Sequence, residues 1–342
     1  MIRQDYDLAY LLQYENVAWY ENGCVRILDR RIYPKVEFVF CYHHEEVALA
    51  IKDMVTQSGG PFLAAGMGMA LAAWECRGKS LAEVNEYLTL AAWRLSNARP
   101  TTSARMSVIT NKCLLVALKA LREGQALDVA VFNHTVEEIN AKYARYNKTA
   151  DYLSSLFPQN GTILTQCYGE TVVGLMLRNA REKNKDIKII CAETRPYFQG
   201  ARLTASVCHD QGFDTTVITD NMVAFCMKNK QIDLFTSAAD VISLDGHVVN
   251  KVGTMQIAIL CDHFNLPYYV TGTPNKDHET IESVSIEMRD PEFVLQAMGT
   301  RTAKEGIKGL YPAFDITPPE LVTGVVTDKG VFKVGELNKY FN

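Results

Sequence analysis

The chain has 342 residues, of which 48% are hydrophobic and 22% charged, and its formal net charge is −4. This composition supports a packed core and excludes an intrinsically disordered chain, and the length favours two domains. A weakly acidic chain lacks the basic footprint of nucleic-acid binding. No apolar run approaches the ~20 residues that cross a bilayer. We therefore expect neither a nucleic-acid nor a membrane partner.

The nine cysteines are scattered mostly through apolar runs, and no C-x-x-C pair occurs among them. An odd number of dispersed cysteines is typical of reduced thiols in the cytoplasm, where disulfides are rare. The polar first residues do not resemble a secretory signal. The sequence thus predicts a cytoplasmic protein with no metal site, and we expect no cofactor.

The N-terminal part begins with short strands. Val17–Tyr20 and Cys24–Leu28 flank Asn22-Gly23, and Asn-Gly between such runs is a strong hairpin signal. The alternating segment Val36–Tyr42 predicts a third strand.

Helical patterns follow these strands. The segment from Ser80 opens with S-L-A-E, a capping box in which serine and glutamate satisfy free N–H groups. The predicted helices are Glu45–Thr56, Leu63–Cys76, Ser80–Leu95, Thr102–Leu121 and Val129–Leu156. We therefore predict a first domain, residues 1–128, made of a small β-sheet and a helix bundle, with the helix at 129–156 as a connector.

Two loops of this part are candidate anion sites. Gly59 and Gly60 precede a helix of small residues, and free N–H groups at a helix start can hold an anion; the alternative is a plain helix–helix turn. Arg99 stands before Pro100, which favours an extended backbone, and Thr101 or Thr102 can cap the next helix. Arg99 is either a phosphate ligand or an ordinary surface arginine.

The remaining chain alternates strands with helices, which predicts βαβ units and a parallel sheet. We therefore predict a Rossmann-like α/β domain over residues 129–342. Its strands are Thr162–Thr165, Ile187–Ala192, Thr215–Ile218, Leu234–Phe235 running to Val241–Ile242, and Tyr268–Val270; its helices are Glu170–Asn184, Phe198–Gln211, Met222–Asn229 and Val249–Phe264. No G-x-G-x-x-G follows the first strand, so a dinucleotide site is not supported.

Two residues of this domain are candidate catalysts. Cys167 ends the first strand and precedes a helix, a position that lowers a thiol pKa; the alternative is a buried cysteine that acts as a small hydrophobe. Asp240 lies within the apolar stretch T-S-A-A-D-V-I-S-L. Burial there would raise its pKa and suit a general acid, whereas a strand-end aspartate that caps a turn is the alternative.

Further polar residues stand where we expect loops to meet helices. They are Gln199, Asn250 and Lys251. Because strand ends line the ligand crevice of an open α/β sheet, these side chains would bind hydroxyls and phosphate near Cys167.

Several segments together resemble the methylthioribose-1-phosphate isomerase family. This family shares a superfamily with ribose-1,5-bisphosphate isomerase and the α, β and δ regulatory subunits of a translation-initiation exchange factor. The resemblance runs from about residue 45 to 335 and rests on G-T-I-L-T-Q-C at Gly161–Cys167, E-T-R-P-Y-F-Q-G-A-R-L at Glu193–Leu203, N-K-V-G-T at Asn250–Thr254, and P-A-F-D-I-T-P-P-E-L at Pro312–Leu321.

The resemblance implies an aldose–ketose isomerase of methionine salvage that acts on a 5-substituted ribose 1-phosphate. Its catalytic pair maps onto Cys167 and Asp240. Its substrate-binding positions map onto Gly59, Gly60, Arg99, Gln199, Asn250 and Lys251. We also expect a homodimer.

The sequence departs from the family pattern at the arginine position taken by Ser58 and at the histidine position taken by Gln166. These changes keep other functions open. The alternatives are an isomerase for 5-deoxyribose 1-phosphate or ribose 1,5-bisphosphate, and a non-catalytic sugar-phosphate or nucleotide sensor. Retention of both catalytic residues favours the enzyme.

Overall fold

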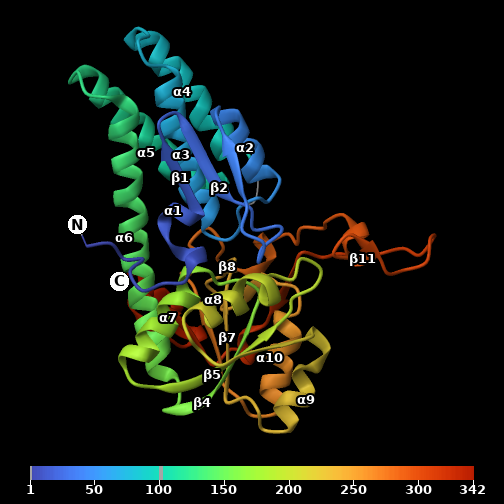
Figure 1. Ribbon diagram of the computed structural model, residues 1–342. Coiled ribbons are helices and arrows are strands. Elements are labelled where there is room, and N and C mark those ends of the chain that lie inside the picture. The colour runs from blue at the N-terminus through green and yellow to red at the C-terminus, as the bar shows by residue number, and fades with distance from the viewer. Residues whose placement is uncertain (1, 100–102) are drawn as a thin grey trace. The chain divides into compact units, whose positions relative to one another are not determined.

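The computed structural model describes residues 2–99 and 103–342. The chain forms two compact units, Met1–Ala144 and Arg145–Asn342, which are described separately below (Figure 1). Helix α6, Leu127–Leu156, passes through the boundary between them. The domain boundary that the sequence places at residue 128 stays a prediction.

The first unit contains a three-stranded antiparallel sheet in the order β1-β2-β3. Its strands are Ala18–Glu21, Cys24–Leu28 and Phe38–Cys41. Asn22 and Gly23 make the turn with φ values of 49° and 79°, a left-handed conformation that these two residue types tolerate. The predicted hairpin and third strand are therefore confirmed.

Helices make up most of the rest of this unit. Ser80 and Glu83 form the predicted capping box, in which the serine side chain accepts from the Glu83 N–H. The predicted caps Thr101 and Thr102 lie outside the described residues. The helices are η1 (Tyr10–Leu12), α1 (Tyr14–Val17), α2 (His44–Lys52), α3 (Gly60–Glu75), α4 (Leu81–Ser96), α5 (Ser103–Arg122) and the first part of α6.

The start of α3 packs too closely to admit a side chain at Gly60. A Cβ there would lie 2.0 Å from Thr56 Oγ1 and 2.9 Å from Arg30 Nη1. Arg30 is fully buried, and its Nη1 donates to the Gln57 carbonyl at 2.6 Å. Glycine at position 60 thus lets the loop before α3 close over a buried guanidinium.

We expect Gly60→Ala to destabilise the first unit by roughly 1–3 kcal/mol, because the added methyl must displace Thr56 or Arg30. The matched control is Gly335→Ala, where no described atom lies within 4 Å of the added carbon. Thermal unfolding of both variants measures the difference. Equal melting temperatures would contradict the close packing at Gly60.

The second unit is built on a seven-stranded sheet in the order β15-β14-β10-β7-β4-β5-β6. Its strands are parallel except β15, which runs antiparallel to β14. The strands are β4 (Asn160–Gln166), β5 (Asp186–Ala192), β6 (Thr215–Ile218), β7 (Leu234–Ala238), β10 (Tyr268–Thr271), β14 (Gly324–Thr327) and β15 (Gly330–Phe332). The predicted Rossmann-like sheet is confirmed.

Helices cover both faces of this sheet. Alternate strand side chains such as Leu164 and Phe235 join the core formed with α9 and α10, whereas Thr165 and Thr236 face a pocket lined by α7. The helical segments are α7 (Thr171–Glu182), the π-helix η3 (Gly200–Thr204), α8 (Ala205–Asp210), η4 (Asp220–Met222), α9 (Val223–Lys228), α10 (Thr254–His263), η5 (Ile281–Ser283), η6 (Pro291–Val294), η7 (Pro319–Leu321) and η8 (Val334–Phe341).

The strand order reverses between β4 and β7. The chain runs outward from β4 through β5 to β6, then returns to add β7 on the other side of β4. Ligands of open α/β sheets bind at such a switch point, outside the carboxyl ends of the strands. The two strands that precede Cys167 and Asp240 are the pair that flank it.

Two smaller sheets complete the unit. One has the order β13-β9-β8, with strands Phe314–Thr317, Val248–Lys251 and Val241–Ile242. The other is the hairpin of β11 (Gln296–Ala297) and β12 (Thr300–Arg301), which extends away from the parallel sheet in Figure 1. The predicted helix Val249–Phe264 was therefore wrong in its first turn, because residues 248–251 pair as a strand with β8 and β13.

Candidate active site

Cys167 follows β4 directly, at the switch point of the sheet. Its φ is 61°, a conformation that costs energy for a residue with a side chain. Two threonines hold it there: the Cys167 N–H donates to Thr194 Oγ1 at 2.9 Å, and Thr204 Oγ1 donates to the Cys167 carbonyl. The strained backbone fixes the direction in which the thiol points.

The environment of Cys167 raises the thiol pKa to about 11. Burial of the sulfur is the main cause, while the Lys251 ammonium opposes the rise and the Asp240 carboxylate adds to it. The sequence-based expectation of a lowered thiol pKa was wrong, because desolvation outweighs the position before a helix. Cys167 is therefore a neutral thiol near pH 7.

Asp240 lies in a bend between β7 and β8, and its side chain is exposed. The sequence predicted one run from Leu234 to Ile242, with the carboxylate buried between apolar neighbours. That expectation was wrong, because the chain leaves the parallel sheet after Ala238 and enters the β8-β9-β13 sheet at Val241. The bend turns the aspartate outward, where its charge reaches Cys167 and Lys251.

Asn250 and Lys251 lie on β9, a strand, and not at a loop–helix junction as the sequence suggested. Lys251 is 5% exposed, its Nζ donates to the Ala313 carbonyl at 2.8 Å, and it lies 4.5 Å from the Phe314 ring centroid. Burial lowers the Lys251 pKa, and the neighbouring Cys167 and Asp240 oppose this.

A hydrogen-bonded chain links the end of β4 to β9 and α10. Gln166 Nε2 donates to the Val252 carbonyl at 3.1 Å, and Thr254 Oγ1 donates to Gln166 Oε1 at 3.0 Å. Asn250 Nδ2 donates in turn to Thr254 Oγ1 at 3.0 Å. Gln166 thereby orients Asn250 through Thr254, a role that sequence reasoning did not assign.

Gln199 precedes η3, close in the chain to the turn after β5. It is 5% exposed, and its Oε1 has no hydrogen-bond partner among the described residues. A buried amide oxygen without a donor is costly, so this atom is ready to accept from a bound hydroxyl.

Sequence reasoning missed two residues near Cys167. They are Arg289, whose charge lowers the Cys167 pKa, and Tyr311, whose own pKa responds to Cys167. Both come from the segment after β10, where the Arg289 N–H donates to the Tyr311 carbonyl at 2.9 Å. Neither stands in a local pattern that would have marked it as functional.

The predicted residues Gly59, Gly60 and Arg99 belong to the first unit. Ser58 takes a φ of 57° and Gly59 precedes α3, which has Pro61 in its first turn. Pro61 has no N–H, and the Gly60 N–H already donates to the Gln57 carbonyl at 3.1 Å. Arg99 is half-buried in a bend after α4.

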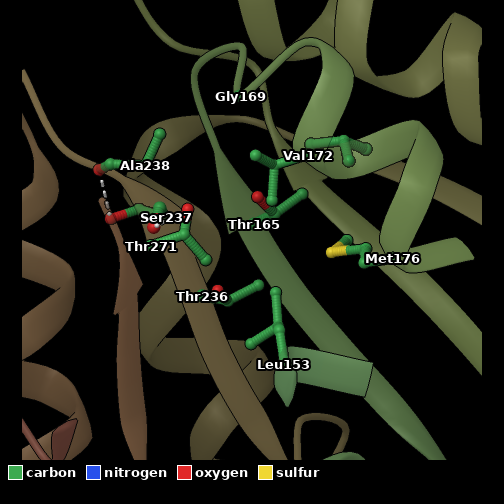
Figure 2. A pocket seen from close by; sticks show the side chains of 10 residues that line it. Leu153, Thr165, Gly169, Val172, Met176, Thr236, Ser237, Ala238 and Thr271 are labelled. Carbon is green, nitrogen blue, oxygen red and sulfur yellow. Dashed lines mark hydrogen bonds between the residues drawn. The ribbon is translucent and has the colours of Figure 1, made fainter. Parts of the chain in front are cut away.

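A small pocket lies on the α7 face of the parallel sheet (Figure 2). Its walls are Leu153, Val172 and Met176 on the helical side and threonines such as Thr165 and Thr236 on the sheet. Because no charged side chain lines it, it does not suit a phosphate.

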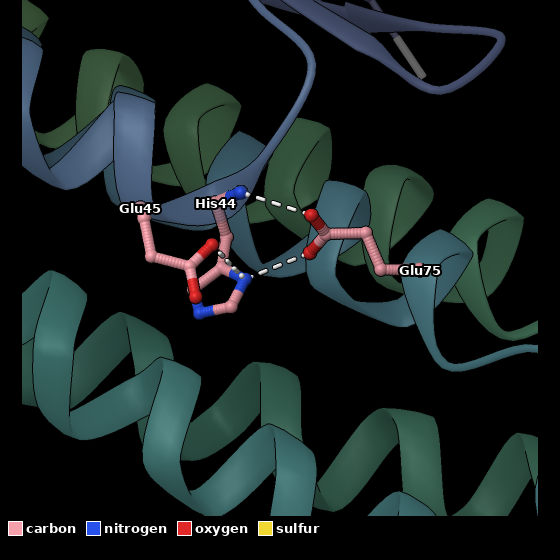
Figure 3. A group of neighbouring side chains, drawn as sticks. All are labelled: His44, Glu45 and Glu75. Carbon is pink, nitrogen blue, oxygen red and sulfur yellow. Dashed lines mark hydrogen bonds and ion pairs between the residues drawn. The ribbon is translucent and has the colours of Figure 1, made fainter.

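One group of side chains in the described residues has metal-binding geometry: His44, Glu45 and Glu75 (Figure 3). His44 Nδ1 lies 2.7 Å from Glu75 Oε2, and Arg94 forms an ion pair with Glu45. Arg94 Nη1 is also 3.4 Å from His44 Nε2. The guanidinium already neutralises the cluster and would repel a cation, so the group is best described as an ion-pair network.

Asp315 is a partly buried carboxylate on β13 that accepts hydrogen bonds from the start of α10. Its Oδ2 accepts from the Gly253 N–H at 2.6 Å and the Met255 N–H at 3.2 Å. Burial raises its pKa to about 6, and these N–H donors oppose the rise. Because the folded pKa exceeds the ordinary value of 3.8, the folded state binds more protons between the two, and this group's contribution to stability falls as pH rises through that window.

We expect Asp315→Asn to remove this loss, since the amide still accepts from both N–H groups and does not ionise. Relative to the wild type, the variant should therefore gain melting temperature between pH 4.5 and pH 7. Asp262→Asn, at an exposed carboxylate on α10, is the control. A difference between Asp315→Asn and wild type that is independent of pH would contradict the raised pKa.

Among the described residues, no helix is both long and apolar enough to cross a membrane.

Comparison with known proteins gives consistent relatives. The sequence profile of the initiation factor 2 subunit family matches residues 61–334. A methylthioribose-1-phosphate isomerase from Thermotoga neapolitana is 36% identical over 339 residues, covering 94% of this chain and 96% of the relative.

Two solved structures share the fold over nearly the whole chain. The 5-methylthioribose 1-phosphate isomerase from Pyrococcus horikoshii has a TM-score of 0.82 and 28% identity, covering 97% of this chain and 98% of that one. A structure named translation initiation factor eIF-2B, subunit delta, from A. fulgidus has a TM-score of 0.80 and 30% identity, covering 92% and 95%.

Proposed function

The chain belongs to the initiation factor 2 subunit family, and we propose that it is an aldose–ketose isomerase that converts methylthioribose 1-phosphate to methylthioribulose 1-phosphate. Isomerases with this substrate in their names align with almost the entire chain. The observation that carries the proposal is the grouping of Cys167, Asp240 and Lys251 within electrostatic range of one another. They meet where the strand order reverses, the usual ligand position in such sheets.

The reaction needs one proton to enter and one to leave. Because the anomeric oxygen carries phosphate, the ring opens when an acid protonates the ring oxygen and the C1–O bond breaks. Hydrogen then moves from C2 to C1, and the C2 hydroxyl loses its proton to become the ketone. We propose Asp240 as the acid at the ring oxygen: the exposed carboxylate takes up a proton from solvent and gives it to that oxygen.

Cys167 is proposed to act at C1 and C2. Since its thiol is neutral near pH 7, it enters the cycle as a protonated group in a poorly solvated environment. In a route through an enediol, the thiol first gives its own proton to solvent, and the thiolate then takes the C2 proton and returns it to C1. In a hydride shift from C2 to C1, the thiol keeps its proton throughout. Both routes have the same overall balance.

The other predicted residues are proposed to bind the substrate. Lys251, Arg99 and the Gly59 and Gly60 amides are assigned to phosphate, which pairs strongly with charged and backbone donors. Gln199 and Asn250 are assigned to sugar hydroxyls. The free acceptor on Gln199 supports this assignment.

The test is turnover of three sugars that differ at C5: methylthioribose 1-phosphate, 5-deoxyribose 1-phosphate and ribose 1,5-bisphosphate. Ketose formation is followed by NMR. We expect the highest kcat/KM with the methylthio sugar. A higher kcat/KM with one of the other two sugars would identify that sugar as the substrate. Absence of turnover with all three would favour the non-catalytic sensor.

We further propose a cytoplasmic homodimer. All nine cysteines are unpaired thiols in the structure, which suits a reducing compartment. Light scattering coupled to size-exclusion chromatography would test the dimer; a mass near 38.3 kDa, that of one chain, would overturn it.

A further inference from the structure

Tyr311 carries a buried hydroxyl whose proton has no acceptor among the described residues. Its side chain is 2% exposed, and its oxygen makes no hydrogen bond of normal geometry with any described residue. Buried hydroxyls are nearly always hydrogen-bonded, because removing them from water is otherwise costly. Because Tyr311 is an exception and lies beside a candidate active site, we expect a bound ligand to supply the missing hydrogen-bond acceptor.

The surroundings hold the Tyr311 ring in place. The ring lies 6.1 Å from that of Tyr197, and the Arg289 guanidinium lies 6.0 Å from the Tyr197 centroid and 5.7 Å from that of Phe314. Arg289 Nε donates to Glu287 Oε1 at 2.8 Å. The Phe314 ring is the one that also contacts Lys251, so this cluster continues into the site.

The neighbouring groups leave the phenol proton without an acceptor. Arg289 lies near the Tyr311 oxygen and opposes the rise of its pKa, but a guanidinium has donors only and cannot accept a proton. Burial raises the Tyr311 pKa to about 12, so the phenol stays protonated near neutrality. Cys167 is within electrostatic range but forms no hydrogen bond with it.

We propose that Tyr311 is a further catalytic residue, whose hydroxyl donates a hydrogen bond to the C2 oxygen of the sugar as that oxygen gains negative charge beside Cys167. Arg289 is the positioning residue that holds the phenol. Tyr311 keeps its proton throughout, so the proton balance of the reaction is unchanged. This inference rests on the proposed isomerase function.

The test is Tyr311→Phe, which removes one oxygen and keeps the ring. A preorganised donor to a developing oxyanion contributes about 100-fold or more to kcat, so we expect a loss of that size with a smaller change in KM. The melting temperature should change little, because the phenol proton has no acceptor among the described residues.

The matched control is Tyr268→Phe. Tyr268 is fully buried, but its hydroxyl is hydrogen-bonded to Ser237 Oγ at 2.7 Å. This variant should lose melting temperature and keep kcat, the reverse of Tyr311→Phe. For Arg289, the methionine variant should lower kcat and Arg289→Lys should restore part of it, with equal melting temperatures for the two.

Three results would overturn the inference in distinguishable ways. A wild type that turns over the sugar together with a Tyr311→Phe variant within about twofold of its kcat would refute Tyr311 alone. A wild type that turns over none of the three sugars would refute the proposed function and this inference with it. A fall in Tyr311→Phe melting temperature with unchanged kcat would assign the hydroxyl a structural role.

Discussion

Replacing Cys167 by serine is expected to lower kcat by about 100-fold or more, the usual loss when a positioned proton carrier is removed. The hydroxyl of serine is much less acidic than a thiol and cannot carry the proton at the same rate. The fold should persist, because the backbone of residue 167 is held by Thr194 and Thr204 and not by the sulfur. Steady-state turnover and thermal unfolding measure the two effects.

The control is Cys226→Ser, a buried cysteine on α9. It should lose stability and keep kcat, since its sulfur packs in the core on the face away from α7. Near-normal turnover of Cys167→Ser would remove this thiol from the mechanism.

The raised thiol pKa adds a pH signature to the same experiment. Burial raises the pKa of Cys167 to about 11. At any pH below that value, each increase of one pH unit should accelerate alkylation by iodoacetamide about tenfold, because the thiolate fraction grows. Mass spectrometry of the Cys167 peptide follows the modification. A rate that levels off near pH 7 would show that a thiolate is already present and would contradict the effect of burial.

Asp240→Asn is expected to abolish most turnover while leaving substrate binding in place, a loss of about 100-fold or more in kcat. Asparagine has the same shape as aspartate but has no acidic proton to give to the ring oxygen. Because the Asp240 side chain is exposed, the melting temperature should change little. Kinetics and a ligand-induced thermal shift separate catalysis from binding.

Asp186→Asn, an exposed carboxylate at the far end of β5, is the control and should behave as wild type. An active Asp240→Asn enzyme would refute the acid role. Loss of the ligand-induced shift in that variant would instead assign the carboxylate to binding.

The elements with local signals could be predicted from the sequence. The Asn22-Gly23 turn and the Ser80 capping box depend on neighbours within a few residues, so their chemistry is visible in one short segment. The alternation of strands with helices also predicted the parallel sheet. The strand end at Cys167 was located for the same reason, since β4 stops at Gln166.

The errors arose where distant segments decide the structure. Residues 248–251 have an apolar pattern that fits a helix or a strand, and pairing with β13, more than sixty positions later in the chain, selects the strand. Asp240 is exposed because the chain before it, up to Ala238, pairs in the parallel sheet, whereas the chain after it, from Val241, pairs in the β8-β9-β13 sheet. No local window contains that information.

The sequence by itself determined the class of fold, the position of Cys167 at a strand end and the set of candidate ligands, because these depend on residue type and short-range order. Only the tertiary structure decided the protonation of Cys167 and the presence of Arg289 and Tyr311 beside it. Desolvation and electrostatic interaction act between groups that are close in space, whatever their separation in the chain. A thiol that its neighbours in sequence would make acidic is thus kept neutral by burial, which outweighs the charges of Lys251 and Arg289.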